Sequence, residues 1–156
     1  MASVSIEKVM DKFNLTNLTP QIDLTNIKIQ QPDVNRPALQ LAGYFEHFEE
    51  TRLQIIGFVE YSYMEYLPEG RKKDVYPKLI SDKTPCFIFC RGLRPDDLFL
   101  ETALKNNVPL LLTEKSTSSF MADIIKWLNV RLAPCISVHG VLVDVYGEGV
   151  LFQMMW

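Results

Sequence analysis

The spacing of apolar residues in the first 30 positions predicts a helix followed by a strand. Between Ile6 and Phe13 they recur three to four residues apart, which predicts an amphipathic helix with Ser5 as its N-cap. The stretch 22–29, IDLTNIKI, alternates apolar and polar residues only in part. It predicts a strand with an irregular register.

A short helix is expected between Pro37 and Gly43. Asn35 is in position to cap it, proline is tolerated in a first helical turn, and glycine commonly ends a helix. Arg36 lies next to the cap and is a candidate for contact with another molecule. The alternative is purely structural, because a capping asparagine and a first-turn proline are enough to explain the sequence Asn35-Arg36-Pro37.

From residue 52 to residue 133 the pattern is regular. Apolar runs at 52–60, 86–92 and 108–114 predict buried strands, and helical stretches follow each of them. Ser116 is positioned to cap the last helix. Strands that alternate with helices predict an α/β fold with a mostly parallel sheet flanked by helices. We expect this domain to cover residues 1–132.

The pattern changes after Pro134. Valine-rich positions lead into the glycine turn YGEGV, residues 146–150, with no helical stretch among them. Strand-like residues around a glycine turn predict a β-hairpin. We expect residues 133–156 to form the first strands of a second unit.

The composition narrows the class of protein. Of the 156 residues, 47% are hydrophobic and 22% charged, and the net charge is −3. The chain can therefore bury a core, and its charge gives no reason to expect a nucleic acid or an anionic membrane as partner. No apolar run reaches the roughly 18 residues of a membrane span, and the charged N-terminal stretch does not resemble a signal peptide. We expect a cytoplasmic protein.

Two cysteines lie in one predicted strand. Cys86 and Cys90 are four residues apart in CFIFC, so both should face the same side of the pleat. Free cysteines are commonly buried, and the sequence places no further ligands close to this pair. We expect two structural thiols and no metal site.

The chain has two histidines, His47 and His139. His47 stands among acidic residues in YFEHFEE and is expected in a solvated loop. His139 shares a strand face with Ser137, but no third group that would orient it is evident, so a hydrolytic triad is not indicated. On the residues alone, His139 is either a histidine hydrogen-bonded in a strand or a functional residue that needs a phosphate or nucleophile partner.

Two sequence patterns could indicate a phosphate-binding site, namely a glycine-rich phosphate-binding loop and a strand end that leads into a helix. The pattern GxxxxGK[ST] does not occur in the 156 residues. The stretch CRGLRPDD ends a strand and opens a helix, so its backbone amides could meet an anion. Asp96 and Asp97 oppose such binding, and Arg91 and Arg94 could offset them.

Three stretches together resemble one family, the bacterial HPr kinase/phosphorylases. Residues 35–63, NRPALQLAGYFEHFEETRLQIIGFVEYSY, resemble the beginning of the family's first sheet, and CFIFCRGL resembles its next strand. Residues 131–151, RLAPCISVHGVLVDVYGEGVL, are similar to the join between the family's N-terminal domain and its kinase domain. This last motif is the most specific of the three.

The resemblance implies a bifunctional parent enzyme. Such enzymes use ATP to phosphorylate a serine of HPr, the phosphocarrier of sugar uptake, and remove the phosphate by phosphorolysis in carbon catabolite control. The family is hexameric, and its catalytic C-terminal domain uses a phosphate-binding loop and Mg²⁺. Its N-terminal domain is similar in fold to the nucleotide-sugar-binding domain of cell-wall ligases.

By the same resemblance, His139 matches the histidine of the family's HGVLVD motif, which is associated with the active site. The resemblance therefore implies a catalytic role for His139, near the transferred phosphate, where an imidazole could stabilise charge. We expect no residue of this chain to bind ATP or Mg²⁺, although both are implied for the full-length parent.

The sequence departs from the family's pattern after Leu151, where FQMMW stands in place of the phosphate-binding loop. Phosphoryl transfer depends on positioning and charge stabilisation by that loop. We therefore expect a regulatory or architectural N-terminal domain, inactive alone and prone to self-association, whose parent meets HPr through the missing kinase domain. The alternative is a freestanding α/β module that binds a small ligand or effector at the strand carboxyl ends.

Overall fold

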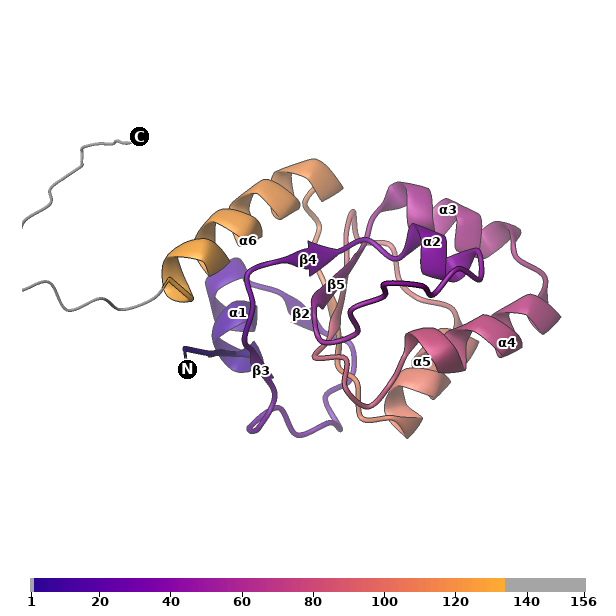
Figure 1. Cartoon of the computed structure of the whole chain (residues 1–156), viewed down its shortest axis with the longest axis horizontal. Helices are drawn as coiled ribbons and strands as arrows, with labels where there is room; N and C mark the ends of the chain where they lie inside the picture. The colour runs from indigo at the N-terminus through magenta and orange to yellow at the C-terminus, as the bar shows by residue number, and fades with distance from the viewer. Residues whose placement is uncertain (1, 134–156) are drawn as a thin grey trace, which may run out of the picture.

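The structure is a computed structural model, and it describes residues 2–133. The strands are β1 (Val4–Ser5), β2 (Thr16–Asn17), β3 (Lys28–Ile29), β4 (Val34–Asn35), β5 (Leu53–Ile56), β6 (Phe87–Phe89) and β7 (Leu110–Leu112). The helices are α1 (Ile6–Phe13), α2 (Ala38–Leu41), α3 (Phe58–Tyr66), α4 (Glu69–Leu79), α5 (Asp97–Lys105) and α6 (Thr117–Arg131). Helices pack on both sides of a central sheet (Figure 1).

The central sheet has five strands in the order β2-β7-β6-β5-β4. Strands β4 to β7 are parallel, and β2 lies antiparallel to β7. Helices α3 and α4 connect β5 to β6, and α5 connects β6 to β7. The predicted α/β fold with a mostly parallel sheet flanked by helices is therefore confirmed.

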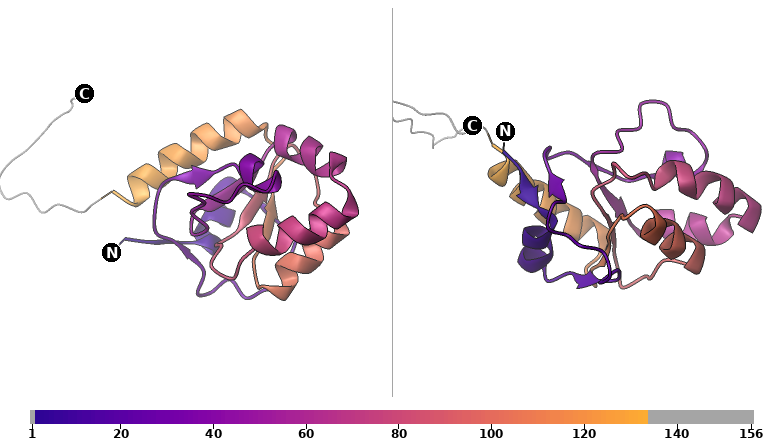
Figure 2. Two further views of the ribbon diagram at one scale, coloured as in Figure 1. Left: turned by 45° about the vertical axis from the view of Figure 1, so that its right-hand side comes forward. Right: turned by 90° about the horizontal axis from the view of Figure 1, so that it is seen from below.

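Alternation along the central strands divides the core into two layers. Cys86, Ile88 and Cys90 belong to the layer beneath α1 and α6, and both cysteines are buried free thiols on one face, as predicted. Phe87 and Phe89 belong to the opposite layer, which α2 to α5 cover. Figure 2 shows α1 and α6 on one side of the sheet and α3, α4 and α5 on the other.

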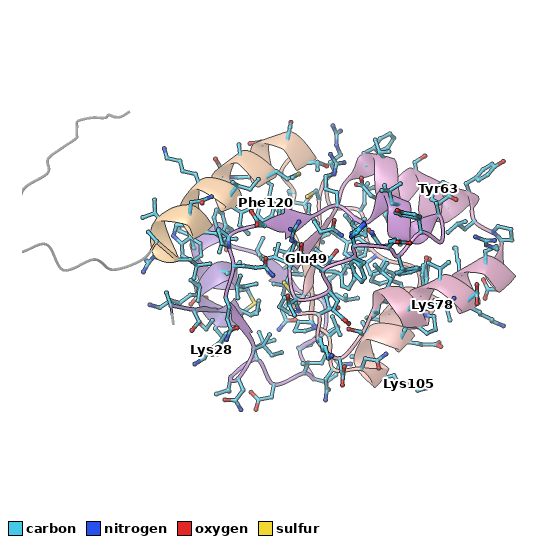
Figure 3. The ribbon with its side chains drawn as sticks, in the orientation of Figure 1. Lys28, Glu49, Tyr63, Lys78, Lys105 and Phe120 are labelled. Carbon is cyan, nitrogen blue, oxygen red and sulfur yellow. The ribbon has the colours of Figure 1, made fainter. Side chains whose placement is uncertain are left out.

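The two predicted serine caps are formed. The Ser5 hydroxyl accepts a hydrogen bond from the Lys8 amide at the start of α1, and the Ser116 hydroxyl accepts one from the Ser119 amide at the start of α6. Helix α6 then buries Phe120 against the sheet, whereas lysines such as Lys105 lie on the outer surface (Figure 3). Local sequence alone therefore accounts for both helices that cover this face.

The strand predicted at 22–29 is shortened to β3, Lys28–Ile29. The residues before it turn instead, because the Asp23 carboxylate accepts hydrogen bonds from both the amide and the hydroxyl of Thr25. Strand β3 pairs antiparallel with β1 in a separate two-stranded sheet. The sequence pattern did not predict β1.

Asn35 does not cap α2, contrary to the sequence prediction. It lies in β4, where its side-chain amide donates a hydrogen bond to Gln54 Oε1 at 2.7 Å, and α2 begins after Pro37 with no side-chain cap. Gly43 ends this helical segment as expected, with a φ of 100°. Asn35 is thus a strand residue whose side chain is oriented by a cross-strand partner, and it does not occupy the cap position.

The described residues end just after α6, which closes at Arg131. The domain boundary predicted between residues 132 and 133 stays a prediction, because all but the first residue of the 133–156 hairpin lies outside the described residues. Within residues 2–133, no helix combines the length and the apolar character needed to cross a membrane.

Candidate functional site

The carboxyl ends of the parallel strands meet at one edge of the sheet, where ligands of α/β folds commonly bind. We call this the carboxyl edge. The residues that leave the strands at this edge are Arg36 after β4, Gly57 after β5, Cys90, Arg91 and Gly92 after β6, and Thr113 and Glu114 after β7.

A buried carboxylate organises one half of the carboxyl edge. Glu60 is only 3% exposed, and its Oε1 lies 2.9 Å from Arg36 Nη2. The same oxygen accepts a hydrogen bond from the Gly57 amide at 2.7 Å. Because Glu60 is in the first turn of α3, its charge also faces the positive end of the helix dipole. Arg36 is thus bound within the chain while its side chain stays 36% exposed.

Gly57 permits the Arg36–Glu60 contact because the Arg36 guanidinium and the Thr117 side chain both lie close to its Cα. A Cβ atom at this position would lie 2.6 Å from Arg36 Nη2 and 2.6 Å from Thr117 Oγ1. Real Cβ atoms do not come so close to other heavy atoms. The end of β5, the guanidinium of Arg36 and the start of α6 therefore meet only where residue 57 has no side chain.

The turn after β6 forms the other half of the carboxyl edge. Arg91 and Gly92 both have left-handed backbones, with φ of 60° and 66°. Their amides donate hydrogen bonds to the carbonyls of Lys115 and Thr113, each at 2.9 Å. The Arg91 guanidinium lies 5.6 Å from the ring centroid of Phe58, a cation–π contact at the surface.

The thiol at this edge is held in its neutral form. Burial raises the pKa of Cys90 to about 11, although the Thr117 hydroxyl and the Arg36 charge act in the opposite direction. A nucleophilic cysteine needs a lowered pKa. Cys90 is therefore a packing residue at neutral pH.

The start of α5 is occupied by the chain's own carboxylate. Asp96 Oδ1 accepts the Phe99 amide at 2.8 Å, and its Oδ2 lies 3.1 Å from Lys72 Nζ and 2.8 Å from the Tyr76 hydroxyl. Arg94 contributes only its carbonyl, which accepts the Tyr61 hydroxyl. Of the groups that CRGLRPDD offered to an anion, Arg91 and Arg94 both stay exposed, whereas the Phe99 amide is taken by Asp96.

The chemistry available at the carboxyl edge is that of binding. It presents the Arg91 guanidinium over the Phe58 ring, which is 56% exposed, and the partly exposed guanidinium of Arg36, which is paired with Glu60. Within residues 2–133 there is no group of three or more side chains that could hold a metal ion. The edge can therefore receive an anionic or aromatic partner.

The sequence-predicted site residues fall into two sets. His47 lies exposed in a turn between α2 and β5, as expected for a solvated histidine. His139 and its strand neighbour Ser137 lie outside the described residues, so the catalytic role of His139 stays a prediction.

Sequence reasoning singled out Arg36 but missed its partner, Glu60. A signal was present in GFVE, because a glycine followed three residues later by glutamate is typical of a helix start. The Lys72–Asp96 pair had no such local signal, since its members are 24 residues apart.

The fold defines the class: an α/β domain with a mostly parallel sheet flanked by helices. The sequence matches the family described as "HPr Serine kinase N terminus" over residues 4–128. The chain belongs to this family, as the resemblance in its motifs implied.

Full-length relatives support the same assignment. The chain is 54% identical over 153 residues to an HPr kinase/phosphorylase from Lachnoclostridium phytofermentans, which covers 98% of this chain and 50% of the relative. It is 37% identical over 151 residues to the HPr kinase/phosphorylase from Bacillus subtilis, with 97% and 48% covered. The chain therefore spans about half the length of the curated relatives it matches.

One solved structure shares the fold. It is the regulatory region of Clostridium perfringens pyrophosphatase, with CBS and DRTGG domains, in complex with the activator diadenosine tetraphosphate. The TM-score is 0.52 at 18% sequence identity, and the match covers 78% of this chain and 46% of the other. At this identity the likeness concerns the fold alone.

Proposed function

We propose that this chain is the regulatory or architectural N-terminal domain of an HPr kinase/phosphorylase. The observation that carries the proposal is the family match over residues 4–128, together with relatives about twice as long as the chain. A binding edge made of guanidinium groups and an exposed ring is compatible with a domain that receives a partner or an effector.

In the complete enzyme we propose the reaction that the relatives' name suggests. ATP with Mg²⁺ would phosphorylate a serine of HPr, and phosphorolysis would remove the phosphate, as part of carbon catabolite control in the cytoplasm. We also propose that the enzyme assembles as a hexamer and that His139 lies near the transferred phosphate. The phosphate-binding pattern GxxxxGK[ST] does not occur in the 156 residues, so we assign the catalytic step to another part of the enzyme.

A domain exchange tests this proposal. Residues 2–133 of this chain replace the matching residues of the Lachnoclostridium phytofermentans enzyme, to which the chain is 54% identical. With HPr and γ-labelled ATP, we expect the 156-residue chain to transfer no label and the exchanged enzyme to label HPr at a rate within about tenfold of the relative's own.

Circular dichroism and thermal unfolding of the exchanged enzyme establish that it is folded. Label on HPr from the 156-residue chain alone would contradict the assignment of catalysis to another part of the enzyme. A folded exchanged enzyme that fails to label HPr, beside an active relative, would contradict the domain assignment.

A further inference from the structure

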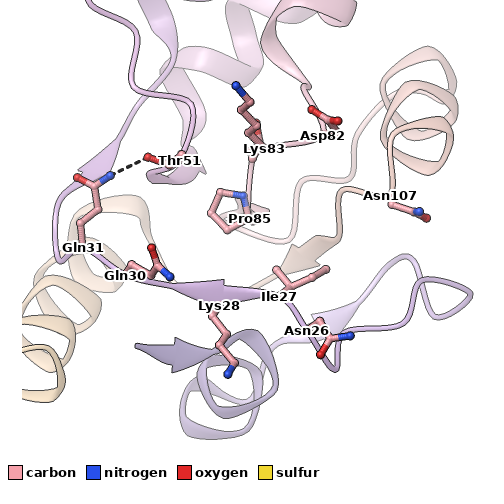
Figure 4. A pocket seen from close by; sticks show the side chains of 11 residues that line it. Asn26, Ile27, Lys28, Gln30, Gln31, Thr51, Asp82, Lys83, Pro85 and Asn107 are labelled. Atoms are coloured by element: carbon pink, nitrogen blue, oxygen red, sulfur yellow. Dashed lines mark hydrogen bonds between the residues drawn. The ribbon is translucent and has the colours of Figure 1, made fainter. Parts of the chain in front are cut away.

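A cavity of about 520 Å³ opens at the amino ends of the parallel strands, the edge opposite the carboxyl edge. Thr51, Pro85 and Asn107 stand shortly before β5, β6 and β7 and form one wall. Residues around β3, from Asn26 to Gln31, form the facing wall (Figure 4). We call this the amino-edge cavity.

Carboxamide side chains dominate the lining of the amino-edge cavity. They are Asn26, Gln30, Gln31 and Asn107. Gln31 is already engaged, because its Nε2 donates a hydrogen bond to Thr51 Oγ1 at 2.9 Å across the rim (Figure 4). Within residues 2–133 the other three side chains make no hydrogen bond. All three residues are exposed, so their carboxamides are accessible to a ligand from solvent.

Thr84 supplies an independent observation. It lines the amino-edge cavity and is 4% exposed, and its hydroxyl has no hydrogen-bond partner within the described part of the chain. A buried polar group without a partner is uncommon and needs a reason. The hydroxyl oxygen is covered, and rotation about the χ1 bond is the movement that would present it to the cavity.

The remaining lining residues exclude several ligand classes. Only Ile27 and Pro85 are apolar, and no aromatic ring lines the cavity in the described chain, so a nucleobase has no stacking partner. Lys28 and Lys83 point away from each other on opposite sides of Pro85 (Figure 4), so they do not converge on a polyphosphate. Asp82 also lines the cavity, and its negative charge opposes an anion, so the cavity favours a neutral, polar ligand.

We propose that the amino-edge cavity binds a neutral polyhydroxylated molecule, a mono- or disaccharide, through Asn26, Gln30, Asn107 and Thr84. A carboxamide places a donor and an acceptor side by side, and each sugar hydroxyl both donates and accepts. The cavity volume lies within the range of small-molecule sites, roughly 300–1,000 Å³. The proposal goes beyond the kinase assignment and does not depend on it.

The test is a titration of the 156-residue chain with glucose and, separately, with maltose, in which the amide NMR spectrum of the chain is recorded at each sugar concentration. We expect saturable shifts confined to residues 26–31, 51, 82–85 and 107. Gln30→Ala removes one ligand hydrogen bond and should weaken binding about tenfold. Gln21→Ala is the matched control, because Gln21 is exposed and lies outside the cavity.

Thr84→Val separates a ligand role from a structural one. The change keeps the shape and removes a hydroxyl that has no partner, so the unfolding midpoint should stay equal or rise while sugar affinity falls. A lower midpoint with unchanged affinity would overturn the role of Thr84.

Two results would overturn the proposal as a whole. One is the absence of saturable shifts with either sugar. The other is binding of glucose 6-phosphate at these residues without binding of glucose, which would show an anion site. Neither result affects HPr labelling by the exchanged enzyme, so failure of this proposal and failure of the proposed function are distinguishable.

Discussion

At the scale of single residues, the carboxyl edge uses two glycines for different reasons. Gly57 has an ordinary φ and is needed because Arg36 and Thr117 approach its Cα. Gly92 has a φ of 66° and is needed for its backbone conformation, which lets its amide reach the Thr113 carbonyl. Arg91 adopts a similar left-handed backbone although it carries a side chain. The hydrogen bond from its amide to the Lys115 carbonyl offsets part of this strain.

Gly92→Ala should lower the free energy of unfolding by about 1–2 kcal/mol, because a residue with a Cβ is strained at a left-handed φ. The new Cβ would also lie 2.6 Å from Glu114 Oε1, although that flexible side chain can move. Gly70→Ala is the matched control. Gly70 lies in α4 with no heavy atom within 4 Å of a Cβ, so alanine should raise stability by about 1 kcal/mol. Urea denaturation measures both changes, and equal effects would contradict the backbone argument.

At the scale of elements, α5 packs on the sheet through two fully buried residues, Phe99 and Ala103, of which Phe99 has the larger side chain. Phe99 makes edge-to-face contacts with Tyr76, Phe87 and Phe89, at centroid distances of 5.0, 5.1 and 5.3 Å. Tyr76 belongs to α4, and Phe87 and Phe89 are the first and last residues of β6, so the Phe99 side chain of α5 joins three elements. Edge-to-face pairs stabilise the fold in addition to the stabilisation that comes from burying the apolar area of the rings.

Phe99→Ala should therefore lower the free energy of unfolding by about 3–5 kcal/mol, since it removes a fully buried ring and leaves a cavity. Phe58→Ala is the control with the same chemical change at a position that is 56% exposed. It should cost less than about 1 kcal/mol. Urea midpoints of the two variants compare them directly, and a Phe99 variant as stable as the Phe58 variant would contradict the attachment of α5 through this ring.

At the scale of the whole molecule, the core contains groups that keep their protons to a higher pH in the folded chain than in the unfolded chain. Burial raises the pKa of Cys86 far above its usual 9.0 and the pKa of Cys90 to about 11. Burial, followed by the hydrogen bond to Asp96, also raises the pKa of Tyr76 above its usual 10.0. These residues lie in both core layers, so their ionisation concerns the entire fold.

Between pH 7 and about 9 the thiols should leave the free energy of unfolding unchanged, and it should fall as the pH rises from about 9 through about 11, because the unfolded chain loses thiol protons that the folded chain keeps. Each thiol contributes a slope of up to about 1.4 kcal/mol per pH unit in this range. Cys90→Ala should flatten the decline. Tyr66→Phe should leave it unchanged, because Tyr66 is 83% exposed. Urea denaturation between pH 7 and 11 checks this, and a steeper decline for Cys90→Ala would contradict it.

Helices that depend on interactions between residues close in the sequence were predicted correctly, whereas contacts between distant residues were not. Helix α6 was predictable because its serine cap and its buried positions all lie within one helix. The strand at 22–29 was overestimated because the Asp23 carboxylate binds Thr25 locally. The Asn35 cap was wrong because Asn35 pairs with Gln54 of the next strand as part of β4, and the helix begins only after Pro37. At the site, the sequence indicated only Arg36 of the Arg36–Glu60 pair, because the two residues lie 24 positions apart and no local pattern joins them.

The sequence by itself determined the alternation of elements, the faces of the central strands and the family, because these depend on neighbours within a few residues and on motifs kept in order. The tertiary structure decided the β1–β3 pair, the ion pair beneath the carboxyl edge and the amino-edge cavity. Each of these joins residues that lie tens of positions apart. Such contacts form only after the sheet brings the residues together, so no local pattern specifies them.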